Sequence, residues 1–197
     1  MERCPEEELA LAANLEPYGS GGHLMPIMPR DWSEPFLEQA REDLKAAWSL
    51  ANATPLSAST LCMLIQMVFE KLAKAAFAKG GNVDNRNHQV ASRVFPLIQR
   101  ASPAGVHLVR NSPNVIQFVF ELETAHPFVA NRAEKNDPTV PWPRLEYPWP
   151  DPTASVVLSP AHDLALAQRV RCSSDRIAAD CLKFASAFAK DFHDIIP

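Results

Sequence analysis

Apolar and polar positions alternate near the start of the chain with the three- and four-residue spacing of an amphipathic helix. We expect this helix to run from Ser33 or Glu34 to about Ala51, because a serine can accept hydrogen bonds from the free N–H groups of a first turn. Pro35 is tolerated there, since no donor within the helix is lost. The predicted buried stripe contains Phe36, Ala40, Leu44, Ala47, Trp48 and Ala51.

The next predicted helix, from Leu61 to Lys79, is apolar almost all the way round. Gln66 is the only polar residue in its first nine positions, and charged residues enter only in its later turns. A helix without a polar face has to be buried, so we expect it at the centre of a bundle. Glu70 and Lys74 lie one turn apart and are expected to pair.

Three further helices follow in the prediction. The third runs from Asn87 to about Arg100 and is expected to kink or split at Pro96, which lacks a backbone donor. A fourth begins at Ser112-Pro113, a capping serine followed by proline in the first turn. Together the elements predict an all-α fold, an antiparallel bundle of four to five helices. The last helix, residues 174–195, has the clearest periodicity, and its stripe contains Ile177, Cys181, Phe184, Phe188, Phe192 and Ile195.

The chain divides into an arm and a domain in this interpretation. Residues 1–32 are predicted to form a flexible N-terminal arm, and residues 33–197 a helical bundle domain. The Gly-Ser-Gly-Gly run at residues 19–22 follows no predicted strand and opens no predicted helix. It is therefore interpreted as a linker and not as a phosphate-binding loop.

Residues 127–161 differ in composition from the rest of the domain. They hold eight of the 18 prolines, together with Trp142, Tyr147 and Trp149. Long loops are usually either functional or disordered, and the aromatic content argues against disorder. We predict an ordered, Pro-rich strap inserted before the last helix, with a short β-hairpin around residues 155–158.

The overall composition is that of an ordinary globular protein, with 47% hydrophobic and 21% charged residues and a net charge of −4. Proteins that bind phosphates without specificity are usually basic, so general nucleic-acid binding is not expected. No apolar run approaches the roughly 18 residues that suggest a transmembrane helix, and the acidic first residues are unlike a signal peptide. We expect a cytoplasmic protein without membrane contact.

The four cysteines form neither a C-x-x-C pair nor a metal-binding spacing, so no metal and no cofactor are predicted. Cys62 and Cys181 lie on apolar helical faces and are expected to be buried. The chain contains none of the common nucleotide-binding, hydrolase or metalloprotease patterns.

The first helices resemble the HEPN domains of prokaryotes. The resemblance rests on Phe36–Ala47, on Glu70–Ala75 and on Asn87-His88, and it covers roughly residues 33–125, with the last helix completing the bundle. It implies a four- to five-helix bundle that often forms homodimers. It also implies a role in toxin–antitoxin or defence systems.

Active members of that family are metal-independent ribonucleases, and they use an arginine, a polar residue directly after it and a histidine four to six residues further along. In this chain Arg100 and His107 have that separation, but Ala101 stands where the polar residue is expected. Arg110 is followed by Asn111, a suitable pair, but by no suitably spaced histidine. In such a site the histidine would move a proton of the ribose 2′-hydroxyl, and an arginine would stabilise the negative phosphorane.

Other polar residues are candidates for ligand binding, each with a simpler explanation beside it. His88, which follows Arg86-Asn87, can bind a phosphate at a helix start or lie in a capping turn. His126 can form a small pocket with Arg132 or act as a favourable cation at a helix end.

The aromatic residues of the strap also allow two interpretations. Trp142, Tyr147 and Trp149 can stack bases, or they can cover a face of the bundle that would otherwise be exposed. We interpret the whole chain as a non-catalytic interaction or regulatory module with nucleotide or RNA contact, in which Asn111 is a further binding candidate. The alternative is a metal-independent endoribonuclease with a non-standard Arg/His site. A third interpretation of the chain is a purely structural partner of a nucleotidyltransferase.

Overall fold

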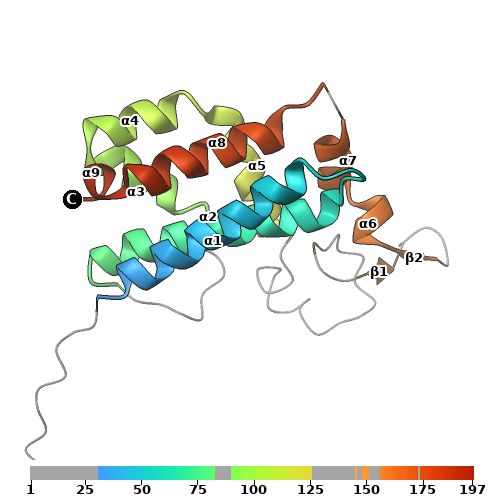
Figure 1. Cartoon of the computed structure of the whole chain (residues 1–197), viewed down its shortest axis with the longest axis horizontal. Helices are drawn as coiled ribbons and strands as arrows, with labels where there is room; N and C mark the ends of the chain where they lie inside the picture. The colour runs from blue at the N-terminus through green and yellow to red at the C-terminus, as the bar shows by residue number, and fades with distance from the viewer. Residues whose placement is uncertain (1–30, 83–89, 126–144, 146–147, 151–155, 173) are drawn as a thin grey trace, which may run out of the picture. The chain divides into compact units, whose positions relative to one another are not determined.

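The computed structural model describes residues 31–82, 90–125, 145, 148–150, 156–172 and 174–197, and helices dominate these ranges (Figure 1). All of these residues belong to one unit, Asp31–Pro197. The prediction for the N-terminal arm lies outside the described residues, except at its last two positions. The helices in the described ranges are α1 (Ser33–Ala51), α2 (Ala58–Lys79), α3 (Val94–Ala101), α4 (Pro103–Arg110), α5 (Pro113–Thr124), α6 (Pro160–Asp163), α7 (Ala165–Arg171), α8 (Ile177–Lys190) and α9 (Phe192–Ile195).

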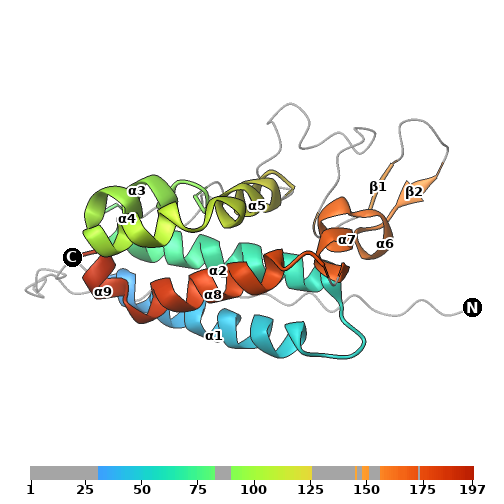
Figure 2. The ribbon, with the colours of Figure 1, turned by 90° about the horizontal axis from the view of Figure 1, so that it is seen from above.

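Helix α2 forms the centre of the bundle, as its apolar sequence predicts. It contacts α1, α3, α5, α7 and α8, and Figure 2 shows α3, α4 and α5 on one side of it and α1 on the other. Its side chains are buried on nearly every face. Glu70 and Lys74 form the predicted pair, 2.8 Å apart and almost fully buried, and Gln66 donates a hydrogen bond of 3.2 Å to Glu70. Such a pair has to stay complete, because one charge alone in the interior is strongly destabilising.

Helix α1 begins where predicted, but its cap differs from the prediction. The N-cap position is held by Trp32, and Asp31 just before it bonds to the first turn: its Oδ1 accepts a hydrogen bond of 2.9 Å from the backbone N–H of Ser33 and one of 2.6 Å from the Ser33 hydroxyl. The serine itself is buried in the first turn. The buried stripe also includes Leu37, which the sequence interpretation omitted, whereas Phe36 and Trp48 are half-buried at its edge.

The predicted third helix is wrong in its bounds. Residues 90–93 form turns, and α3 begins only at Val94. Pro96 is then the third residue of the helix and not its middle, so its missing N–H removes no hydrogen bond within the helix and no kink is required. The residues from Asn87 to His88 lie outside the described ranges.

Helix α4 was not predicted. It starts with Ser102, whose Oγ accepts a hydrogen bond of 3.1 Å from the N–H of Gly105, and with Pro103 in the first turn. Gly105 lies where α3 and α4 come together, because a Cβ atom there would be 2.2 Å from the carbonyl oxygen of Ile98. The glycine therefore permits a close approach that any side chain would prevent.

The predicted last helix is divided in two. Helix α8 begins at Ile177, after Asp175 accepts a hydrogen bond of 3.0 Å from the Ile177 N–H, and it ends at Lys190. Helix α9 follows after Asp191. This division, together with α4 and the two short helices after the strap, explains why the predicted number of four to five helices is too low for the described residues.

Part of the Pro-rich strap is described, and it is anchored to the core. Leu145 and Trp149 are 3% and 4% exposed. Strands β1 (Trp149–Pro150) and β2 (Val157–Leu158) pair antiparallel, so a two-residue ladder is present, but only β2 lies in the residues 155–158 for which the hairpin is predicted. Ser159 caps α6 through its hydroxyl, which accepts a hydrogen bond of 3.2 Å from the N–H of Ala161.

Three phenylalanines tie α2, α3 and α8 together. The ring centroids of Phe69 and Phe95 are 5.9 Å apart, those of Phe69 and Phe184 5.7 Å, and those of Phe95 and Phe184 5.5 Å. Aromatic pairs in such arrangements contribute about 0.5–1.5 kcal/mol each beyond the area they bury. The Phe184 ring is therefore packed against two other rings of the core.

None of the helices in the described ranges has the length and apolar character that crossing a bilayer requires.

Candidate functional site

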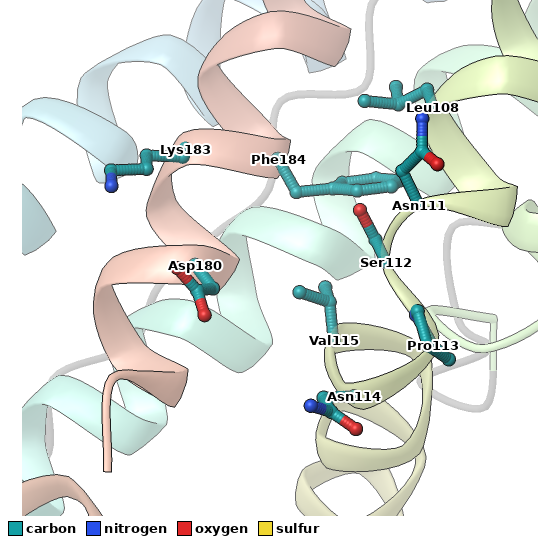
Figure 3. Close-up of a pocket in the computed structure, with 9 residues that line it drawn as sticks. All are labelled: Leu108, Asn111, Ser112, Pro113, Asn114, Val115, Asp180, Lys183 and Phe184. Atoms are coloured by element: carbon teal, nitrogen blue, oxygen red, sulfur yellow. The ribbon is translucent and has the colours of Figure 1, made fainter. Parts of the chain in front are cut away.

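A pocket of about 370 Å³ lies between α8 and the junction of α4 with α5 (Figure 3). Its size is at the lower end of the range for small-molecule sites, about 300–1,000 Å³. We call it the α4–α5/α8 pocket, and the residues that line it are Leu108, Asn111, Ser112, Pro113, Asn114, Val115, Asp180, Lys183 and Phe184.

The junction between the two helices places three polar residues at the pocket. Helix α4 ends at Arg110, and Asn111 occupies its C-cap position. The backbone N–H of Asn111 donates a hydrogen bond of 3.3 Å to the carbonyl of His107. Ser112 then occupies the N-cap position of α5, with Pro113 in the first turn, as the sequence predicts, although the Ser112 hydroxyl makes no capping hydrogen bond. Asn114 follows in the same turn. Its side chain and those of Asn111 and Ser112 supply amide and hydroxyl groups that can both donate and accept hydrogen bonds.

The floor of the pocket is apolar and belongs to the core. Val115 and Phe184 are each 3% exposed, and Leu108 is half-buried. Figure 3 shows the Phe184 ring extending from α8 across the pocket toward Asn111 and Leu108. Because this ring also packs against Phe69 and Phe95, the floor cannot shift without disturbing the aromatic cluster.

Helix α8 contributes two charged residues of opposite sign. Asp180 lies in its first turn and Lys183 one turn later. In Figure 3 the ammonium group of Lys183 is directed away from the α4–α5 junction, whereas Asp180 is on the side of α8 that faces the start of α5. The pocket therefore presents a carboxylate, amides and a hydroxyl above an apolar floor. This arrangement can bind a ligand, but it brings no proton donor and acceptor together as a catalytic pair.

The predicted ribonuclease residues are exposed and make local contacts. Arg100 donates a hydrogen bond of 3.0 Å from Nε to the carbonyl of Pro96, one turn earlier in α3. His107 lies against Asn111, with 3.1 Å between Nε2 and the amide nitrogen. The structure thus brings His107 and Asn111 together, while Arg100 is bonded within its own helix. Arg110 is exposed at the end of α4.

Trp149 is the one predicted aromatic binding residue within the described ranges. At 4% exposure its ring is part of the core, which is the environment of an anchoring residue and not of an open stacking surface. The other binding candidates lie outside the described residues, so those predictions stay as they are: Arg86, His88, His126, Arg132, Trp142 and Tyr147.

The sequence interpretation did not single out Asn114 or Asp180. The Ser112-Pro113 helix start is a visible signal for polar residues at a helix junction, and it could have pointed to Asn114. Asp180 carries no such signal, because an acidic residue in a first turn is common for electrostatic reasons.

A second groove runs between α1 and α8, and two hydrogen bonds join the two helices there. Arg41 donates from Nη2 to the carbonyl of Ala189 at 3.0 Å, and the indole N–H of Trp48 donates to the Ser186 hydroxyl at 3.1 Å. These bonds identify the groove as a seam between two packed helices. A third pocket, of about 600 Å³, lies between the start of α2 and the described part of the strap, and no charged residue lines it.

The described residues form neither a metal site nor a reactive thiol site in the core. Within the described ranges, no three His, Cys, Asp or Glu residues are grouped so that they could hold a metal ion. Cys62 and Cys181 are fully buried, as predicted, and burial raises the pKa of the Cys62 thiol to about 12 and also raises that of Cys181. These thiols are therefore poor nucleophiles in the folded protein.

Comparison with known proteins gives no relative: no family model, no curated protein and no solved structure matches the chain.

Proposed function

We propose that the chain is a non-catalytic interaction or regulatory module with a HEPN-like helical bundle, which contacts a nucleotide or RNA through the α4–α5/α8 pocket. The observation that supports this proposal is the composition of the pocket, where Asn111, Asn114 and Asp180 surround a rigid apolar floor. In this proposal the protein works as a homodimer in a defence or toxin–antitoxin system, with a nucleotidyltransferase as one protein partner.

The contacts of the described residues favour binding over cleavage. Cleavage of RNA without a metal needs a proton-transfer group within hydrogen-bond reach of the ribose, and a cation that stabilises the phosphorane. His107 is engaged with Asn111, and Arg100 with a carbonyl of its own helix. Neither contact directs the two side chains to a shared point.

A binding assay tests this proposal. The full chain would be titrated into a 5′-labelled single-stranded RNA of mixed sequence, with fluorescence anisotropy as the readout. Asn111→Ala should raise the Kd several-fold, since a hydrogen bond contributes about 0.5–1.5 kcal/mol. Asn52→Ala is a matched control, because Asn52 also occupies a helix C-cap, that of α1, and is remote from the pocket.

Two outcomes would contradict the proposal. One is the absence of binding to RNA and to free nucleotides at millimolar concentration. The other is an equal affinity of the Asn111→Ala and Asn52→Ala proteins for the RNA, which would place any contact elsewhere. Sedimentation velocity over a range of concentrations tests the proposed homodimer separately.

A metal-independent endoribonuclease is the second candidate, and one observation favours it. His107, Arg110 and Asn111 lie three and four residues apart, so they share one exposed face at the end of α4. The assay is cleavage of the same RNA in EDTA. Cleavage that disappears in both His107→Ala and Arg110→Ala would establish this candidate, and the absence of cleavage by the wild-type protein would remove it.

A further inference from the structure

We infer that the α4–α5/α8 pocket holds a nucleobase with two adjacent N–H donors, the arrangement on the Watson–Crick edge of guanine, and not a phosphate group. This inference rests on the proposed function and names the part of the nucleotide that enters the pocket.

The charges at the pocket argue against a phosphate. Asp180 lines the pocket on the side of α8 that faces the start of α5, and the ammonium group of Lys183 is directed away from the junction (Figure 3). A phosphate in this position would face a carboxylate, and like charges at short distance repel. A neutral base experiences no such repulsion.

The hydrogen-bonding groups fit a base with two neighbouring donors. A carboxylate such as Asp180 only accepts hydrogen bonds, and its two oxygens can accept two parallel N–H groups at once. Guanine offers such a pair, N1–H and the 2-amino group, whereas adenine offers one exocyclic amine beside an acceptor. The side-chain amide of Asn114 can donate to the neighbouring carbonyl oxygen of guanine, and the amide nitrogen of Asn111, which lies against His107, has a second N–H that can do the same.

The floor of the pocket fits the same kind of ligand. Val115 and Phe184 close the base of the pocket but are each only 3% exposed, so the apolar surface that a ligand can reach is mainly that of Leu108 and Pro113 beside them. A planar base has an apolar face and a polar edge, so its face can lie against this apolar lining while its edge meets the polar rim.

The experiment compares four probes by isothermal titration calorimetry: guanosine, inosine, adenosine and inorganic phosphate. Inosine lacks the 2-amino group and keeps N1–H, so it should bind more weakly than guanosine, and adenosine should bind more weakly still. Inorganic phosphate should not bind in the pocket. Asp180→Asn should weaken guanosine binding about tenfold or more, because hydrogen bonds to a charged group are the stronger kind.

Asp191→Asn is the matched control, since Asp191 is an exposed aspartate at the opposite end of α8 and does not line the pocket. A second measurement uses the wild-type protein alone, so it does not depend on the folding of a variant. In ¹H–¹⁵N spectra guanosine should shift the side-chain amides of Asn111 and Asn114 and leave that of Asn52 unchanged.

Several results would overturn the inference. Stronger phosphate binding by the Asp180→Asn protein would show that the pocket binds the phosphate. Equal affinity for the three nucleosides would show that Asp180 does not recognise the edge of the base. RNA binding that depends on Asn111, without nucleoside binding, would overturn this inference and leave the proposed function standing. Absence of binding to RNA, nucleotides and nucleosides alike would remove the proposed function itself.

Discussion

The close approach of α3 and α4 at Gly105 leads to a specific prediction for Gly105→Ala. The added Cβ would lie 2.2 Å from the carbonyl oxygen of Ile98 and 2.9 Å from its Cγ2. Ordinary contact begins at 3.4 Å, so the two helices would have to separate by about 1.2 Å, the difference between 3.4 and 2.2 Å. The nearest atom belongs to the backbone, and a change of side-chain rotamer therefore cannot relieve the clash.

The expected cost follows from two opposing terms. Overpacking a well-packed contact costs about 1–3 kcal/mol, and a backbone clash places this one at the upper end. Alanine has a higher helix propensity than glycine, which stabilises the folded state by about 1 kcal/mol. We therefore expect a net loss of about 2 kcal/mol, which lowers the Tm by roughly 4–8 °C for a chain of this size.

Urea unfolding followed by circular dichroism measures this loss. Gly80→Ala serves as the control, because a Cβ at Gly80 meets its nearest atom at 3.4 Å and the backbone there has a negative φ of −80°. The control should change the free energy of unfolding by less than about 0.5 kcal/mol. If Gly105→Ala is as stable as the wild-type protein, the close packing of α3 on α4 is refuted, and with it the position of the α4 end of the pocket.

Three other predictions follow from the described side chains. In the folded protein the exposed Cys172 should react with a thiol reagent within minutes, whereas Cys62 and Cys181 should react only after unfolding. Reaction of Cys62 and Cys181 at the same rate as Cys172 would contradict their burial. Replacement of Arg169 by methionine should lower the free energy of unfolding by about 1–2 kcal/mol, because its guanidinium pairs with Glu121 at 2.7 Å, pairs with Asp175 at 3.2 Å and lies over the Phe118 ring. Urea titrations should show a smaller loss of stability in high salt than in low salt. An equal loss in both would exclude an electrostatic contribution. Burial raises the pKa of Glu123, so the folded protein binds this proton more tightly than the unfolded chain does. The free energy of unfolding should therefore fall as the pH rises from the ordinary glutamate pKa through the raised pKa of the folded state. The difference between the pH profiles of the wild-type protein and Glu123→Gln isolates this contribution, and identical slopes would refute it.

The sequence by itself determined the elements whose signals are local. The stripe of α1, the burial of α2 and the Glu70–Lys74 pair all follow from spacing along a single helix, because a helix brings residues three and four apart onto one face. The start of α5 follows from its Ser112-Pro113 pair, since a serine at the N-cap and a proline in the first turn act within a few residues.

Tertiary structure decided what depends on a neighbouring element. Helix α4 is one such case, because its Ser102-Pro103 start is a local signal but only Gly105 lets it pack against α3. Trp149 could have been a stacking surface or an anchor by sequence, and only its burial in the core makes it an anchor. Periodicity identifies the face of a helix that is buried, but not the helix that covers it. For that reason the pocket, which brings Asn111 of one junction to Asp180 of a helix far along the chain, could not be read from the sequence.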